Sequence, residues 1–507
     1  MSTSPSPSAD PAAASGELLG HPKGLFILFS TELWERFSFY SMRGILTLYM
    51  VGVVLTRLGD EAANARADQI YGAYLGFVYS ATFIGGMLAD RLLGQRRAIY
   101  IGGFLMSLAQ FTLMTHGLLT KSGSTFAYLE PMFFLGLALL ACGNGFFKPN
   151  ISTIVGTLYT QQDARRDSAF TIFYVGINIG AALSSFASGA GQKWGWYLGY
   201  MLAGTGMIVS LVIFAWGRRW IEGRGLPPAG ARLLGPGRFG VPNVVPLILG
   251  VLIFLPLAGY LMSRPEYVQG LAVIIAVPVL AYLLFEAWRS PREEAARMIV
   301  IIVLCMFSML FWGFFELAGS TIQRFVDQKM DLMVGPWKLE AAFINNFINP
   351  ALIVAMGVWF SAVWVWLDRR GLDPSTPVKF SLGLLQLGLG FLVLWWAAEQ
   401  AGPTGKASVL WLVLAYFVIT TGELCLAPIG LSMVTKLAPA RLVGMFMGVW
   451  FLSSAIANVL TGGTVGPMTQ RYGFAQVFLC IAGLTGAAAV LLFLLSPLLK
   501  RGMHGVK

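Results

Sequence analysis

The chain has 507 residues, of which 56% are hydrophobic and only 12% are charged, and its formal net charge is +11. Soluble domains are about 25% charged, so this composition excludes an ordinary soluble protein and indicates a chain that crosses a membrane many times. The positive charge reflects orientation in the bilayer rather than a nucleic-acid partner. The four cysteines stand alone and the three histidines are scattered, so no disulfide framework, metal site or cofactor is expected.

Apolar stretches long enough to span a bilayer, which takes about 20 residues, recur along the chain after a Ser-, Ala- and Pro-rich start. Residues 1–22 are predicted to form a disordered cytoplasmic tail. The predicted spans are 25–53, 70–90, 97–118, 126–147, 168–190, 195–216, 241–262, 267–288, 298–323, 343–366, 379–398, 408–430, 442–463 and 473–497. These fourteen spans predict an all-α membrane protein.

The first span carries an unusual cluster of charged residues. At 3.6 residues per turn, Glu32, Arg36, Tyr40 and Arg43 share one stripe of the helix, with Glu35 beside it. A charge at the middle of a membrane costs at least ~2.5–3.5 kcal/mol on insertion scales. The cluster therefore predicts a wet cavity with a function rather than a purely structural contact.

Lysine and arginine residues are distributed unevenly between the two sides of the membrane. With the N-terminus in the cytoplasm, inside segments hold 22 of them and outside loops hold 10, while the remaining three of the 35 lie within spans. This twofold bias predicts that both termini are cytoplasmic.

A Gly- and Pro-rich linker at 217–240 and two featureless spans at 241–288 divide the chain into two six-span halves. The predicted division is a tail (1–22), an N-terminal bundle (23–217), a linker with two extra helices (218–297) and a C-terminal bundle with its tail (298–507). Two six-helix halves with a substrate site between them are a known transporter plan.

The loop after the second span contains Gly86, Asp90, Arg91, Gly94 and Arg97. It resembles the signature loop of the major facilitator superfamily and implies that fold. Asp90 can lie at the positive N-terminal end of a neighbouring helix, and the glycines allow a tight turn.

The charges within the spans differ in sign between the two halves. The N-terminal half is net positive, because its spans carry Glu32, Glu35, Arg36, Arg43 and Lys148. The C-terminal half is net negative, because its spans carry Glu316 and Glu423. A short peptide fits this arrangement, with its carboxylate toward Arg36 and Lys148 and its amine toward Glu423. Opposite charges can also pair across the cavity and close it. Because protonation of the acid would break such a pair, proton coupling is a hypothesis.

Glu32-x-x-Glu35-Arg36-Phe37, followed by Tyr40, resembles the ExxERFxYY motif of the proton-dependent oligopeptide transporter family. The segments 147–152, 173–180, 314–319 and 422–432 resemble further signatures, and the resemblance covers roughly 23–500. It implies a multi-pass bacterial inner-membrane symporter that imports di- and tripeptides with protons. Transport would proceed by alternating access between two six-helix bundles with an extra helix pair.

The resemblance also implies roles for individual residues. Substrate-binding residues are expected to be Arg36, Tyr40, Tyr79, Lys148, Tyr174, Asn178, Phe315, Asn349, Glu423 and Trp450. Proton-coupling residues are expected to be Glu32, Glu35, Arg36 and Glu316. Gate pairs are expected between Arg43 and Glu316 and between Lys148 and Glu423. This chain departs from the family pattern at Phe39, where the motif has Tyr, and at Asn346, where the family often has Gln.

The residues also bear on other function classes. The same fold and proton coupling could serve nitrate or peptide-like compounds, and a membrane channel is the weaker alternative. An enzyme is not expected, because no span combines a histidine with a nucleophile or carboxylates at hydrolase spacing. The expected partners are short peptides, protons and the lipid bilayer, and the chain is expected to be a monomer.

Overall fold

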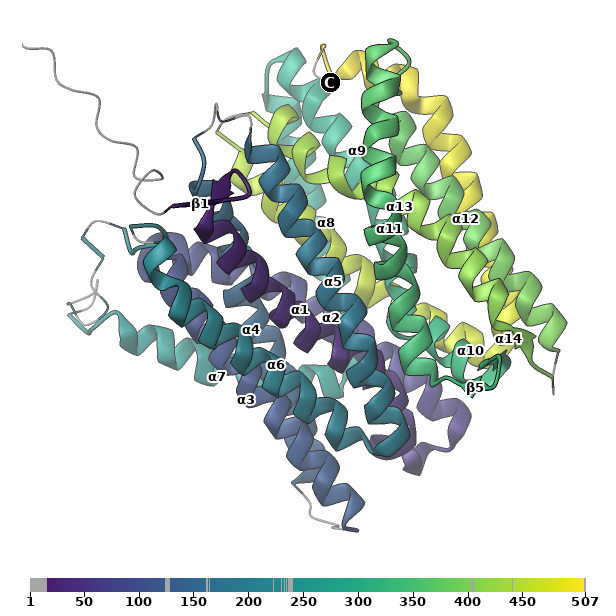
Figure 1. Ribbon diagram of the computed structural model, residues 1–507. Coiled ribbons are helices and arrows are strands. Elements are labelled where there is room, and N and C mark those ends of the chain that lie inside the picture. Colours follow the sequence, from purple (N-terminus) through teal and green to yellow (C-terminus); the bar gives the residue numbers. More distant parts are fainter. Residues whose placement is uncertain are drawn as a thin grey trace, which may run out of the picture.

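The computed structural model describes residues 16–123, 128–160, 163, 165–221, 223–228, 230–231, 233, 235, 240–402, 405–439 and 441–505. These residues fold almost entirely into helices, which form two bundles that face each other (Figure 1). The start of the first helix and the end of the last lie toward the same end of the bundles (Figure 1). We call this end the termini side and the opposite end the far side.

The predicted disordered tail is only partly within the described residues. Residues 1–15 lie outside them. The rest of the tail contains a short antiparallel hairpin of β1 (Glu17–Leu18) and β2 (His21–Pro22). A 2.8 Å ion pair joins Glu17 to Arg165 of the N-terminal bundle. Composition cannot show such a long-range contact, so the prediction of disorder does not hold for this hairpin.

The N-terminal bundle contains six long helices. They are α1 (Lys23–Tyr49), α2 (Asp60–Leu88), α3 (Gln95–Lys121), α4 (Leu129–Thr157), α5 (Arg165–Trp194) and α6 (Trp196–Trp216). Short turns extend or connect them: two π turns at Met50–Val54 and Ala89–Leu93, and 3-10 turns at Thr56–Leu58 and Gly217–Ile221. The inserted pair follows as α7 (Val244–Ser263) and α8 (Pro265–Arg289).

The C-terminal bundle is built from the remaining helices. They are α9 (Arg292–Phe315), the 3-10 turn Glu316–Gly319, α10 (Thr321–Lys329), α11 (Ala341–Arg369), α12 (Thr376–Ala401), α13 (Val409–Leu437) and α14 (Val443–Gly502). Two-residue strands pair in the far-side loops: β3 (Met330–Asp331) with β6 (Ala407–Ser408), and β4 (Met333–Val334) with β5 (Trp337–Lys338).

The helix count agrees with the predicted fourteen spans. Among the described residues, 13 helical stretches are long and apolar enough to cross a membrane. The last of them, α14, runs over 60 residues, but Gly473 within it has φ 81° and ψ 170°. Only glycine adopts this backbone conformation readily, so α14 is two membrane helices joined at Gly473. The predicted span 298–323 differs, because the turn Glu316–Gly319 separates α9 from α10.

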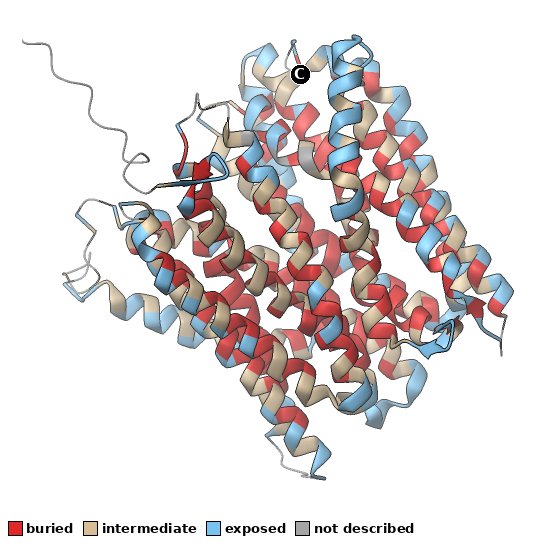
Figure 2. Ribbon diagram, viewed as in Figure 1, coloured by how far each residue is buried: buried red, intermediate tan, exposed pale blue. Residues whose placement is uncertain are grey.

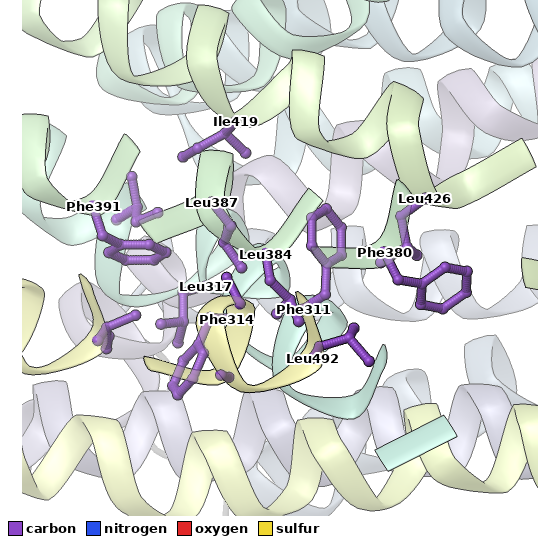
Figure 3. Close-up of a cluster of buried hydrophobic side chains, with 14 of the residues drawn as sticks. Phe311, Phe314, Leu317, Phe380, Leu384, Leu387, Phe391, Ile419, Leu426 and Leu492 are labelled. Carbon is purple, nitrogen blue, oxygen red and sulfur yellow. The ribbon is translucent and has the colours of Figure 1, made fainter. Parts of the chain in front are cut away.

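Each bundle has its own apolar core. In the C-terminal bundle, Phe314 of α9 packs edge-to-face against Phe391 of α12, in one apolar cluster with Leu492 of α14 (Figure 3). Buried residues concentrate where helices meet, whereas α7 and much of α11 are exposed (Figure 2). Large apolar side chains such as Trp359 remain on the outer surface, as expected for helices surrounded by lipid.

Helices α2 and α4 cross in direct backbone contact. A methyl group placed on Gly85 of α2 would overlap the carbonyl of Gly145 of α4. A methyl group on the next residue, Gly86, would lie 3.6 Å from Pro149, which is ordinary van der Waals contact. Only the first of these two neighbouring glycines is therefore required for the helices to pack at this distance.

Gly85→Ala is expected to lower the free energy of unfolding by about 1–3 kcal/mol, the usual cost of overpacking. The matched control is Gly86→Ala, which should change stability by less than about 0.5 kcal/mol. The midpoint of thermal unfolding in detergent measures both. Equal midpoints for the two variants would contradict the close contact between α2 and α4.

Polar contacts join the two bundles on the far side. The Thr47 hydroxyl donates to the carbonyl of Gly319 at 3.0 Å. Gln192 of α5 donates to Asp327 of α10 at 2.7 Å and accepts from the backbone N–H of Ala342 at 2.8 Å. Toward the termini side, α5 and α11 diverge (Figure 1). The far side is therefore closed.

A buried ion pair is part of this closure. Asp68 of α2 pairs with Arg324 of α10, and the two side chains are 0% and 3% exposed. The Thr321 hydroxyl also donates to Asp68 at 2.7 Å. An exposed pair nearby, Arg66 with Glu266 at 2.8 Å, joins α2 to α8.

Asp68→Asn is expected to destabilise the far-side closure, because Arg324 would remain buried without its counter-charge. Removing one partner of a buried pair typically costs about 3–5 kcal/mol, whereas an exposed pair contributes at most about 1 kcal/mol. Thermal unfolding should show a large loss for Asp68→Asn and little for the control Glu266→Gln. The double variant Asp68→Asn/Arg324→Gln should recover much of the loss. Equally small losses for both single variants would rule out the buried pair.

Candidate functional site

A cavity of about 250 Å³ lies between the two bundles. Its walls come from α1, α2, α4 and α5 on one side and from α9, α11 and α13 on the other. Most residues predicted for the site line it: Glu32, Arg36, Tyr40, Arg43, Tyr79, Lys148, Tyr174, Asn178, Phe315, Glu316, Asn349 and Glu423. Glu35 and Trp450 are not among the described residues that line it.

The charges of α1 form one connected group. Arg36 Nε lies 3.2 Å from a Glu32 oxygen, and the same guanidinium binds both oxygens of Glu35, one at 2.6 Å. Glu35 is fully buried and also accepts from Asn144 of α4 at 3.4 Å. Glu35 thus orients Arg36 from the buried side, away from the cavity. The second oxygen of Glu32 is buried and, within the described residues, has no hydrogen-bond partner.

The predicted pair of Arg43 and Glu316 is in contact at 2.6 Å. Arg43 Nε also donates to the Tyr71 hydroxyl at 2.7 Å, and the Tyr79 hydroxyl donates to Glu316 at 3.1 Å. Glu316 is the first residue of the 3-10 turn between α9 and α10, where its carboxylate contacts Arg43 of α1 and Tyr79 of α2. The contact closes the cavity from the far side, although the role of the pair as a gate stays a prediction.

The second predicted pair is not formed. Lys148 and Glu423, both described, make no ion pair with each other. Lys148 Nζ lies 5.6 Å from the ring centre of Tyr79, and Glu423 accepts a 2.9 Å hydrogen bond from Asn349. The two charges stand on walls of the cavity that belong to different bundles, so their pairing would require the bundles to move closer together at this point.

The other predicted residues supply shape and hydrogen bonds. The Asn178 amide donates to the Tyr174 carbonyl at 2.9 Å, so one of its donors is already used within α5. Phe315 stacks against Phe311 with ring centres 5.8 Å apart. Trp450 lies outside the lining, because its indole fills the space left by Gly430 of α13. This placement differs from the predicted role of Trp450 as a wall of the cavity.

The two positions that depart from the family pattern have specific contacts. Phe39 lies beneath Arg36, whose guanidinium carbon is 5.2 Å from the ring centre. The ring of Phe39 therefore makes a cation–π contact with Arg36, and the chain lacks the hydroxyl that a Tyr would add at this point. Asn346 bridges the bundles by donating to the Tyr40 carbonyl at 3.2 Å and to the Ser184 hydroxyl at 2.8 Å.

The lining also includes three polar residues, Gln323, Asn345 and Tyr416, that were not assigned to the site from sequence. The Tyr416 hydroxyl donates to Asn345 at 2.7 Å, and Asn345 donates to Gln323 at 2.5 Å. Helical spacing offered a signal for two of them. Tyr416 precedes Glu423 by two turns and Asn345 precedes Asn349 by about one turn, so each shares a face with a predicted residue.

Two helical bundles that enclose a charged cavity within a membrane define a class of protein, the multi-pass membrane transporters of the major facilitator fold. The chain belongs to the POT family, because the sequence model of that family matches residues 96–230 and 262–478.

Similar proteins cover nearly the whole chain. The uncharacterized transporter YclF of Bacillus subtilis is 34% identical over 96% of this chain and 96% of its own length. The peptide transporter YePEPT of Yersinia enterocolitica is 35% identical, covering 94% of this chain and 95% of its own length. A solved structure of a peptide transporter POT in complex with sulfate is 33% identical. It has a TM-score of 0.82 and covers 98% of this chain and 100% of its own.

Proposed function

We propose that the chain is a proton-coupled symporter that imports di- and tripeptides across the bacterial inner membrane by alternating access. It acts as a monomer with both termini in the cytoplasm, and it is not an enzyme. The observation that carries the proposal is the charge arrangement of the cavity. Arg36 and Lys148 lie on the wall of one bundle, and Glu423 lies on the wall of the other.

A short peptide matches this arrangement because its two ends carry opposite charges. The planar guanidinium of Arg36 can bind a carboxylate through two parallel hydrogen bonds, and Lys148 adds a point charge. Glu423 and Asn349 offer acceptors for the amino end. A volume of about 250 Å³ is near the lower limit of common ligand pockets, which favours di- and tripeptides over longer chains.

Proton coupling follows from the competition for Arg36. Its guanidinium already contacts two carboxylates, Glu32 at 3.2 Å and Glu35. A substrate carboxylate would be the third. Protonation of Glu32 removes one competitor and frees donors of Arg36 for the substrate. The second oxygen of Glu32, which has no hydrogen-bond partner among the residues that the structure describes, is the natural place for that proton.

Names of relatives support the substrate class. Relatives from Lactococcus lactis that are 32% identical are di-/tripeptide transporters by name. A solved peptide transporter POT mutant in complex with alafosfalin is 35% identical with a TM-score of 0.81. This complex with alafosfalin supports peptide-like compounds as an additional substrate class.

The test is uptake of labelled dialanine into proteoliposomes that contain the purified protein. An inward proton gradient with a negative-inside potential should drive accumulation that unlabelled di- and tripeptides abolish. The control is the same vesicles without a gradient, in which uptake should only equilibrate. Folded protein in tight vesicles that shows no gradient-dependent uptake would refute peptide symport.

A further inference from the structure

Helix α7 of the inserted pair is buried at one end only. Its buried residues, Ala258, Gly259 and Met262, all lie in the last two turns, on the far side. There Gly259 is in ordinary contact with Phe134 of α4, because a methyl group on it would lie 3.5 Å from the Phe134 carbonyl oxygen. The earlier turns of α7 have no buried residue, and Gly250 has open space around it.

A cavity of about 400 Å³ lies between these earlier turns and the N-terminal bundle, beside the contacts that Leu247, Val251 and Phe254 of α7 make with that bundle. Ile84 and Leu88 of α2, Cys142 and Phe146 of α4, and Leu247 and Val251 of α7 form its walls. We call this space the α7 cavity. Asn243, at the end near the termini side, is the one amide side chain among the described residues that line it.

The surroundings determine what can occupy the α7 cavity. Apolar cavities do not hold water, because water needs two to four polar partners. All three helices cross the membrane, so the medium beside the cavity is lipid hydrocarbon. An acyl chain is therefore the occupant whose chemistry matches the walls.

One end of the cavity is suited to a lipid phosphate. Leu92, in the turn after α2, lines the cavity, and its neighbour Arg91 is exposed on the termini side. Arginine binds phosphate through its forked donors, and a basic residue near the membrane surface is attracted to anionic lipids. We propose that the α7 cavity binds one acyl chain of a membrane phospholipid whose phosphate lies at Arg91.

This site lies behind the transport cavity. Helices α2 and α4 carry Tyr79 and Lys148 on one face and Ile84 and Phe146 on the other. A bound chain would fill the remaining space between these helices and α7, and would add to the contacts that Leu247 and Val251 already make with the N-terminal bundle. The inference depends on the membrane-embedded fold and is independent of the transported substrate.

Photolabelling tests the proposal. The protein is reconstituted into vesicles that contain phosphatidylglycerol with a diazirine at the middle of one acyl chain. After illumination, mass spectrometry locates the labelled residues. Labels should concentrate in 81–92, 142–146 and 243–254, well above the level on the outer surfaces of α8 and α11. Uniform labelling of all lipid-facing surfaces would mean ordinary surrounding lipid and would overturn the proposal.

Two variants sharpen the test. Gly250→Phe places a ring in the α7 cavity and should reduce labelling of α2 and α4 roughly tenfold, if the ring removes about 1.4 kcal/mol of binding. Its matched control is Gly270→Phe on α8, where the glycine also has open space but does not line the cavity. Labelling of α2 and α4 that survives Gly250→Phe would also overturn the proposal.

Arg91→Gln tests the position of the phosphate. It should weaken labelling by the phosphatidylglycerol probe and leave labelling by a diacylglycerol with the same diazirine chain unchanged. An equal effect on the two probes would mean that Arg91 does not bind the lipid phosphate, and would overturn that part of the proposal. Because the readout is labelling, failure of the peptide-uptake assay would leave these results unaffected.

Discussion

Glu32→Gln is expected to abolish proton-driven accumulation of peptide while leaving peptide exchange measurable. The amide keeps the size of the side chain and its place beside Arg36, but it cannot take up or release a proton. Gradient-driven uptake in proteoliposomes should fall to the level of passive equilibration. Exchange of internal for external peptide, which needs no net proton movement, should continue.

The control for this experiment is Glu61→Gln, which removes an exposed acid at the start of α2, away from the cavity. It should transport like the wild type. Undiminished uphill accumulation by Glu32→Gln would show that the proton is carried elsewhere. Loss of exchange as well as accumulation would show that Glu32 serves substrate binding rather than coupling.

Lys148→Ala is expected to weaken peptide binding by about 10- to 100-fold, because a hydrogen bond to a charged group contributes about 1.5–3 kcal/mol. Lys148 lies on the cavity wall, and its ammonium group has Tyr79 rather than a carboxylate beside it. Its charge is therefore available to a substrate carboxylate. Competition of unlabelled dialanine against a labelled peptide measures the affinity.

Lys193→Ala, which removes an exposed lysine at the end of α5, is the control and should leave affinity unchanged. Lys148→Arg should bind better than Lys148→Ala, because the charge is kept although its geometry differs. Wild-type affinity in Lys148→Ala would mean that the lysine only extends toward the membrane surface.

Periodicity along single helices was the dependable part of the sequence analysis. The stripe of Glu32, Arg36, Tyr40 and Arg43 could be placed on one face of α1, because helical geometry alone fixes which residues share a face. These four residues line the cavity. The same geometry could not show that Glu35 lies behind Arg36, since that orientation depends on Asn144 of a different helix.

Contacts between the bundles were harder to predict. The pair of Arg43 and Glu316 is formed and that of Lys148 and Glu423 is not, although the residue types suit both. The difference comes from the closed far side, which is a property of one arrangement of the bundles and not of any sequence pattern. Asp68 lay just outside a predicted span, so its buried pairing with Arg324 had no sequence signal.

The closed far side has an electrical consequence. A water-filled cavity that opens to one compartment takes nearly the potential of that compartment, so most of the membrane voltage falls across the sealed layer. That layer contains the pairs Arg43–Glu316 and Asp68–Arg324. A proton that crosses it gains or loses about 2.3 kcal/mol per 100 mV over a short path. Delivery of a proton from the far side to Glu32 should therefore be the most voltage-dependent step of the cycle.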